Sequence, residues 1–163
     1  MAKRDSNWTN ADGLVVGFGT REAETTYSAK ASRGGPEQQI VMRIKGADLA
    51  DSDVAAQLVH APVIPAGAFI KSAYLQVDTA FEGVNAVLDI GLYKLSDGTA
   101  VDDDGIDSAI ATATLVAHYD VACDGAEVGK EQSVACKVAA SYDTAAFTAG
   151  EATLIVTYVQ PLP

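Results

Sequence analysis

The chain has 163 residues, of which 48% are hydrophobic and 20% charged, and its formal net charge at pH 7 is −11. This length and composition predict one globular domain and exclude a disordered chain. No apolar run reaches the roughly 18 to 20 residues of a membrane span. The N-terminus, MAKRDSNWTN, lacks the hydrophobic stretch of a signal peptide, so we expect a soluble protein made in the cytoplasm.

Charge is divided unevenly along the chain. Residues 1–45 contain seven Lys and Arg against five acids, whereas residues 46–163 contain four against seventeen. Such an acidic body repels nucleic acid and anionic lipid, so neither is an expected partner. The mildly basic leading segment could dock on an acidic partner, although basic residues could also fall there without a role.

The first part of the chain differs from the rest. Residues 1–12 and 19–37 are polar and show no period, and a weak strand candidate lies between them at 14–18. We therefore expect residues 1–37 to form an extended N-terminal arm with a first strand and a long loop, and 38–163 to form the body. A connection of this length is typical of a functional or partner-bound segment, and a free loop is the alternative.

The body shows the two-residue period of half-buried strands. The segments with this period are 40–45, 69–78, 88–93, 133–138 and 152–159, with a weaker candidate at 116–123. Lys71 interrupts the inward face of the 69–78 segment. About seven such strands, separated by turn residues, predict an all-β fold in which two antiparallel sheets pack face to face as a β-sandwich.

One or two short helices are also expected. The first would begin after Asp107 or Ser108 as its cap, with Ile110 and either Ala113 or Thr114 on its buried side. The second would cover residues 54–59. The preceding stretch SDGTAVDDDGID, at 96–107, then becomes an acidic exposed loop that leads into the first helix.

The aspartates of this stretch raise the question of a bound cation. With Gly105 at the sixth position of an EF-hand loop, the first and twelfth positions are Ala100 and Ala111, which excludes that template. A different calcium loop that uses Asp102 and Asp104 stays open beside a simple solvated turn. No other metal site and no cofactor is predicted.

Motifs of catalysis are missing from the sequence. It has no nucleophile elbow, phosphate-binding loop, dinucleotide fingerprint or zinc-protease motif, and His60 and His118 have no metal-ligand spacing. We therefore expect a protein that is not an enzyme. Cys123 and Cys136 fall on inward positions and could face each other on neighbouring strands, either as two buried thiols or as a disulfide.

Three segments carry a resemblance to a known class of proteins. They are VIPAGAFIKSAYLQVDTAF (63–81), LDIGLYKLSDGTAVDDDGIDSAIATATL (88–115) and FTAGEATLIVTYV (147–159). They resemble small virion structural proteins of tailed bacteriophages, the capsid decoration (cement) or head-fibre class. The resemblance implies a jelly-roll-like sandwich, commonly a homotrimer, that binds the major capsid protein on the exterior of the virion.

On this interpretation the protein stabilises an assembled capsid by bridging its subunits, and residues 1–45 face the shell. The expected capsid-binding residues are the basic residues and the tryptophan of the arm: Lys3, Arg4, Trp8, Arg21, Lys30 and Arg33. The alternative function is a carbohydrate- or receptor-binding β-sandwich. Sugar sites use exposed aromatic side chains, and the aromatic share of 7% with one tryptophan disfavours that alternative.

Overall fold

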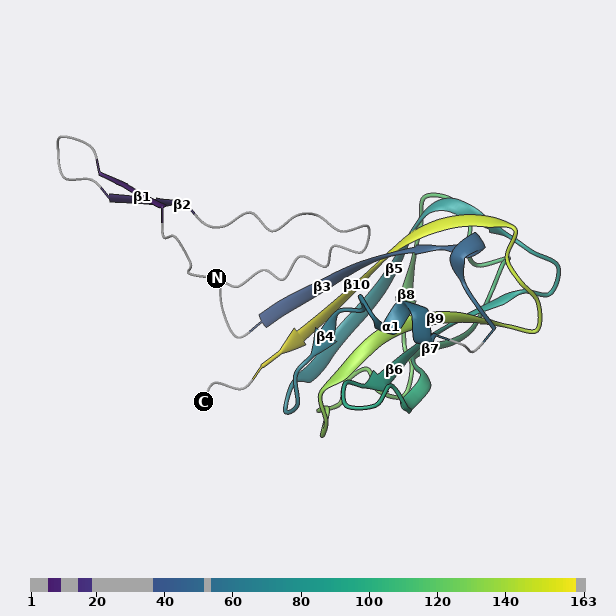
Figure 1. Cartoon of the computed structure of the whole chain (residues 1–163). Helices are drawn as coiled ribbons and strands as arrows, with labels where there is room; N and C mark the ends of the chain where they lie inside the picture. Colours follow the sequence, from purple (N-terminus) through teal and green to yellow (C-terminus); the bar gives the residue numbers. More distant parts are fainter. Residues whose placement is uncertain (1–5, 10–14, 19–36, 52–53, 161–163) are drawn as a thin grey trace.

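The computed structural model describes residues 6–9, 15–18, 37–51 and 54–160. Within these ranges two four-stranded antiparallel sheets pack face to face (Figure 1). A separate two-stranded antiparallel sheet joins β1 (Ser6–Thr9) to β2 (Val15–Phe18). The predicted all-β sandwich is therefore confirmed.

The two large sheets contain strands from both halves of the body. The first sheet has the order β3 (Glu37–Lys45), β10 (Ala149–Val159), β5 (Phe69–Glu82) and β8 (Tyr119–Cys123). The second sheet has the order β4 (Val63–Ile64), β9 (Cys136–Asp143), β6 (Val87–Lys94) and β7 (Ala100–Ala111). Between β3 and β4 lie a 3₁₀ turn, η1 (Gly46–Asp48), and a short helix, α1 (Ala55–Leu58).

The strands pair in a nested order: the two middle strands of the body pair with each other, and each earlier strand pairs with a correspondingly later one. β6 pairs with β7 and β5 with β8, and further out β4 pairs with β9 and β3 with β10. Additional pairs, β5 with β10 and β6 with β9, complete the sheets. Eight antiparallel strands arranged in this way form a jelly roll, as the sequence resemblance implied.

The core lies between the facing sheets and follows the predicted alternation. Leu88, Ile90 and Leu92 of β6 are fully buried, and Leu154 and Val156 of β10 meet them from the other sheet as members of the same cluster. An antiparallel sheet with one buried face and one solvated face needs this two-residue pattern, which is why the pattern was visible in the sequence.

A β-bulge explains why Lys71 interrupts the pattern of β5. Thr157 of β10 pairs with Ser72, whereas the next residue, Tyr158, pairs with Ile70, so Lys71 is the extra residue. Ile70 and Ala73 are both buried although they are three positions apart, whereas a regular strand buries residues two or four positions apart. The bulge shifts the face by one position, and Phe69, predicted to point inward, is 42% exposed instead.

The two helices predicted from the sequence have different outcomes. The helix expected after Asp107 is wrong, because Ala100–Ala111 forms β7 and Asp107 pairs with Ile90 of β6. The helix expected at 54–59 is confirmed as α1. None of the helices in the described ranges is long and apolar enough to cross a membrane.

Candidate functional site

The acidic stretch of the sequence forms a large bulge in β7. β6 pairs Ile90 with Asp107 and Leu92 with Asp102, so two steps along β6 correspond to five steps along β7. The extra residues leave the ladder and carry the backbone of Asp103 directly over Gly91. A Cβ atom on Gly91 would lie 2.2 Å from the carbonyl oxygen of Asp103, so this crossing requires a glycine.

The turn between β6 and β7 uses one aspartate of the stretch for structure. The Asp97 carboxylate accepts hydrogen bonds from the backbone N–H of Thr99 at 2.9 Å and from its hydroxyl at 2.7 Å. The backbone hydrogen bond and then the hydroxyl bond lower the pKa of Asp97. Gly98 follows with a φ of +73°, which glycine adopts without strain. Asp97 is therefore a turn residue.

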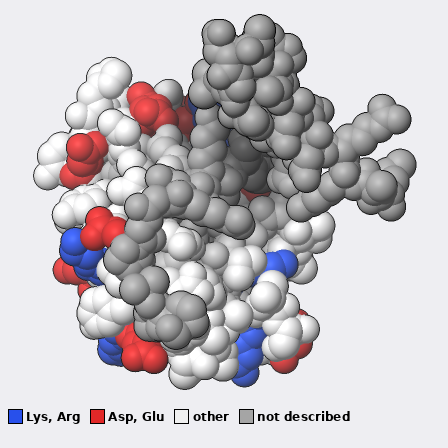
Figure 2. Space-filling view, turned by 90° about the vertical axis from the view of Figure 1, so that its left-hand side faces the viewer, with Lys and Arg blue, Asp and Glu red and all other residues white. Residues whose placement is uncertain are grey.

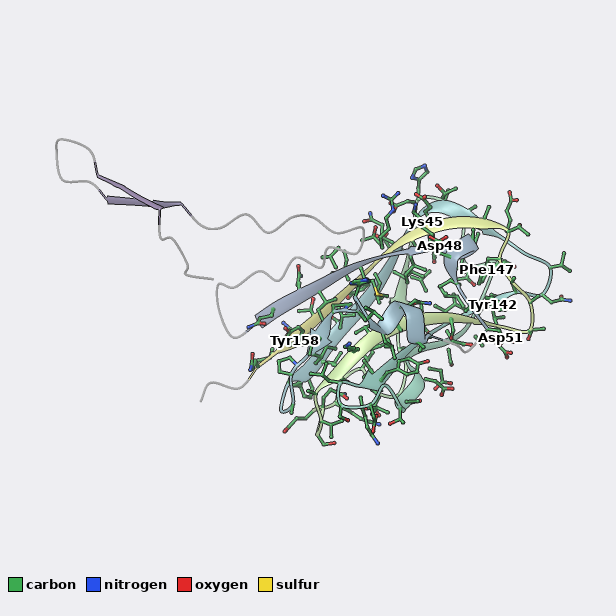
Figure 3. The ribbon with its side chains drawn as sticks, viewed as in Figure 1. Lys45, Asp48, Asp51, Tyr142, Phe147 and Tyr158 are labelled. Atoms are coloured by element: carbon green, nitrogen blue, oxygen red, sulfur yellow. The ribbon has the colours of Figure 1, made fainter. Side chains whose placement is uncertain are left out.

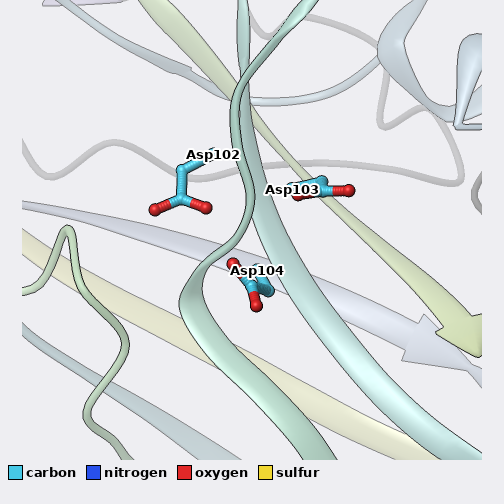
Figure 4. Close-up of side chains that lie close together, drawn as sticks. All are labelled: Asp102, Asp103 and Asp104. Carbon is cyan, nitrogen blue, oxygen red and sulfur yellow. The ribbon is translucent and has the colours of Figure 1, made fainter.

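Three consecutive aspartates of the bulge lie close together. One carboxylate oxygen from each of Asp102, Asp103 and Asp104 lies within 4.8 Å of the others (Figure 4). A hydrogen bond with Asp104 is the main cause that raises the pKa of Asp102, with burial adding to it. Clustered carboxylate oxygens are ligands that a hard cation such as Ca²⁺ accepts. The sequence had named Asp102 and Asp104, and the structure adds Asp103.

Part of this cluster belongs to an open groove lined by aspartates from four segments. We call it the aspartate groove and define it by Asp51, Asp89, Asp103, Asp104 and Asp143. Asp51 reaches the groove because it forms a β-bridge with Tyr142 of β9, and the two residues lie at the same end of the sandwich (Figure 3). The ion pairs formed by residues 37–51 and 54–160 involve none of the five carboxylates.

Asp89 is the partly buried member of the aspartate groove. Its carboxylate accepts a hydrogen bond of 2.7 Å from the backbone N–H of Ala109, which has a φ of 51°. Burial raises the pKa of Asp89, and the charges of Asp143, Asp104 and Asp103 raise it further. One backbone N–H therefore stabilises the charged form of Asp89, while burial and the three neighbouring carboxylates destabilise it.

Replacing Asp89 with asparagine should therefore raise the melting temperature at pH 7. The raised pKa means that protonation stabilises the fold below the unfolded value of 3.8, and this contribution is lost as the pH rises through the folded pKa. Asparagine keeps an oxygen acceptor for Ala109 without the charge. Melting curves at pH 7 and at pH 3 check the prediction, and the difference should shrink at the lower pH.

Asp120→Asn is the matched control, because Asp120 is an exposed residue of β8 outside the aspartate groove. It changes the net charge by the same amount. If Asp89→Asn melts no higher than Asp120→Asn at pH 7, the proposed cost of the Asp89 charge is contradicted.

The two cysteines lie in different sheets, so the expectation of neighbouring strands is wrong. Cys123 ends β8 and Cys136 begins β9, and both are free, buried thiols. Burial, aided by Asp107, raises the pKa of Cys123 to about 12, and burial raises that of Cys136 to about 11. At neutral pH both stay protonated, which is typical of structural rather than nucleophilic cysteines.

Asp107 contacts Cys123 across the edge of the sandwich. Its side chain is 8% exposed, and its carboxylate accepts a hydrogen bond of 2.8 Å from the backbone N–H of Ser108. Burial is the largest cause that raises the pKa of Asp107, and the charge of Asp124 adds to it. Asp107 thus joins two edge strands, β7 and β8, instead of capping a helix.

A small apolar groove of about 80 Å³ lies on the opposite edge, beside β3. Its lining combines β3 with the segments that follow η1 and α1: Val41, Met42, Leu49, Ala61 and Pro62, with Val138 of β9. Charges around it are mixed in sign, since Arg43 and Lys45 both pair with Glu151 of β10. Figure 2 likewise shows Lys and Arg side chains beside Asp and Glu on one face of the molecule.

Most residues predicted to bind a capsid lie outside the described residues. This holds for Lys3, Arg4, Arg21, Lys30 and Arg33. Trp8 lies in β1, opposite Val16 of β2. Sequence reasoning missed Asp51, Asp89 and Asp143, because nothing local in the sequence shows that the register of β6, β7 and β9 brings them together.

Comparisons with known proteins gave two solved structures. No family model matches the chain, and no curated protein matches its sequence. A chain titled "Capsid of Ralstonia phage GP4" has a TM-score of 0.48 and 18% identity, covering 88% of this chain and 93% of that chain. A chain titled "Cyanophage Pam1 capsid asymmetric unit" has a TM-score of 0.41 and 15% identity, covering 87% and 98%. Both TM-scores are below 0.5.

Proposed function

We propose that the protein is a virion structural protein that binds the outer surface of an assembled phage capsid and stabilises it by bridging capsid subunits. One observation carries the proposal: the three segments that resemble phage decoration proteins form the framework of the jelly roll. Residues 63–81 contain β4 and most of β5, 88–115 contain most of β6 and all of β7, and 147–159 contain β10. The likeness thus concerns strands that define the fold.

The proposed activity is binding rather than catalysis. The thiols of Cys123 and Cys136 have raised pKa values, which disfavours a nucleophilic role. The clustered aspartates lie in an open groove rather than a closed cleft. A β-sandwich whose conspicuous features are surface grooves and edges supports a structural role.

The leading segment is the proposed contact with the shell. Residues 1–37 contain five basic and five acidic residues, and the two further basic residues of 1–45, Arg43 and Lys45, lie on β3. Residues 46–163 contain four basic residues against seventeen acidic ones, so an acidic capsid surface would repel the arm less than the body. A ligand that binds only the assembled capsid stabilises that state by mass action. Repetition over the lattice adds avidity, and a homotrimer would add more.

Co-sedimentation with capsids tests this proposal. The probe is an empty capsid assembled from the major capsid protein encoded in the same genome, mixed with the full chain. We expect the full chain to sediment with the capsids, and deletion of residues 1–12, or Lys3→Glu with Arg4→Glu, to weaken binding at least about tenfold. The matched control, Lys94→Glu with Lys130→Glu, makes the same charge change on the body and should bind normally.

Each outcome decides one part of the proposal. If the full chain stays in the supernatant at low salt, the decoration function is wrong. If the chain binds and the deletion binds equally well, the arm is not the anchor. An equal loss in the arm variant and the body control would mean that general charge, not the arm, governs binding.

The sugar-binding alternative gains no support from the exposed tyrosines of the body. Tyr74 and Tyr119 are both about half exposed. Tyr74 pairs with Ala122 on the outer face of the first sheet, whereas Tyr119 pairs with the inward residue Val77. The two rings therefore lie on opposite faces and do not form one stacking platform for a sugar.

A further inference from the structure

The two sheets have four edge strands, and β3 is the long regular one. β4 has two residues and β8 has five. β7 is covered in part, because the N–H groups of Gly125 and Glu127 donate to the carbonyl oxygens of Ile106 and Gly105. β3 has nine residues and pairs only with β10, and no backbone hydrogen bond among residues 37–51 and 54–160 reaches its outer edge.

The sequence of β3 is complementary to itself when read in the antiparallel direction. EQQIVMRIK begins with an acid and ends with a base, and its centre is Val41. Antiparallel pairing of all nine residues would place Glu37 opposite Lys45, Gln39 opposite Arg43 and Val41 opposite itself. Each of these pairs lies on the outer face of the sheet, where opposite charges directly across a ladder stabilise pairing.

We propose that two copies of this chain associate by antiparallel pairing of β3 with β3 about a two-fold axis at Val41. The first sheets of the two copies then form one continuous eight-stranded sheet. Such an interface uses the same patch on both copies and closes as a dimer. It covers the outer edge of β3, which no other described strand binds, and so protects that edge from unspecific strand addition.

The existing ion pairs on the outer face fit this register. Glu37 binds Lys71 at 2.9 Å, and Lys45 lies 3.9 Å from Glu151, with side chains of Glu37 and Lys45 that are 51% and 47% exposed. In the dimer, Lys45 of one copy would enter between Glu151 of its own copy and Glu37 of the other. The result is a row of alternating charges across the junction at both ends of the paired strands.

The apolar residues near the centre of β3 also fit. On the outer face, Val41 continues a cross-strand row with Ile155 and Tyr74. On the inner face, Ile40 would lie opposite Met42 of the other copy, beside the apolar groove that Met42 lines. The second copy thus covers a half-buried apolar edge, while the charges at the two ends fix the register.

This inference goes beyond the proposed function and does not depend on it, since it concerns the isolated protein. A two-fold pair through β3 is also distinct from a three-fold trimer, which would need a different surface. The other occupants of the same edge would be the chain's own leading segment or a strand of another protein.

Sedimentation of the full chain over a range of concentrations tests whether the dimer forms and whether it depends on the pairs between Glu37 and Lys45. We expect a reversible dimer, and we expect Glu37→Lys or Lys45→Glu alone to weaken it by about tenfold, because each changes two attractive pairs into repulsive ones. The double variant Glu37→Lys with Lys45→Glu restores opposite charges and should regain the dimer. A monomer at all concentrations, or a loss that the double variant does not repair, would overturn the proposal.

Cross-linking tests the axis itself. Val41→Cys places two thiols opposite each other at a Cα separation of about 4.5 to 5.5 Å, which a disulfide spans. Mild oxidation should give a covalent dimer on a non-reducing gel, while Gln76→Cys, exposed on β5 of the same face, should not. The native thiols are buried and do not compete. If Val41→Cys folds normally and stays uncross-linked, β3 does not pair with itself and another occupant covers the edge.

Discussion

Gly91→Ala is expected to lower the free energy of unfolding by about 3 kcal/mol or more, a large share of the stability of an ordinary domain. The reason is steric. A Cβ atom would lie 2.2 Å from the oxygen, 2.4 Å from the carbonyl carbon and 2.6 Å from the Cα of Asp103. These are backbone atoms, so no side-chain rotation relieves the contact. Either the bulge of β7 lifts away or β6 shifts within a fully packed core. Urea denaturation of both proteins measures the loss.

Gly129→Ala is the matched control for this substitution. Gly129 has a φ of +83°, and a Cβ atom there meets nothing within 4 Å, so the control reports backbone strain without a clash. We expect it to cost roughly 1 kcal/mol. If the two variants lose equal stability, the backbone of Asp103 does not pass over Gly91, and the geometry of the acidic cluster is wrong with it.

The strands that the sequence revealed are those with one buried and one solvated face. The inward isoleucines of β3 and the inward residues of β6 and β10 are buried as expected. β6 is also buried on its outer face at Tyr93, where Val54 and Leu58 pack against it, so its burial alternates only in part. β7 was missed because its bulge destroys the alternation: between the paired residues Asp102 and Asp107, the four residues 103–106 lie opposite the single residue Gly91 of β6. A dense run of aspartates and glycine is typical of a loop, and only the register with β6 shows that the chain returns to a strand on both sides of it.

The aspartates of the candidate site likewise include some that the sequence indicated and others that only the structure brings together. Asp102 and Asp104 were named from the sequence because they are neighbours in it. Asp51, Asp89 and Asp143 belong to three other segments, and their approach depends on sheet order and register, which alternation does not encode. The self-complementarity of β3, in contrast, is written in nine consecutive residues. Its bearing on dimerisation depends on the structure, in which no described strand other than β10 pairs with β3.

Leu154→Ala should have a comparable effect on stability, by a different mechanism. Leu154 is fully buried in β10, between Met42 of β3 and Leu75 of β5, and belongs to the core that joins the sheets. Truncation removes buried methyl groups and leaves a cavity that central strands fill poorly, with a cost of about 3 kcal/mol. For a domain of this size, that corresponds to a fall in melting temperature of roughly 6 to 12 °C.

Thr153→Ala, at the neighbouring position of β10, is the matched control for Leu154→Ala. Thr153 points to the opposite face of β10, where its hydroxyl donates a hydrogen bond of 3.1 Å to the exposed Asp78. Thr153→Ala should therefore cost at most about 1 kcal/mol. Two adjacent positions with the same backbone pairing then differ only in which face they occupy. A loss at Thr153 as large as that at Leu154 would mean that the outer face of the first sheet is itself buried, as it would be if a partner covered the whole sheet and not only the β3 edge.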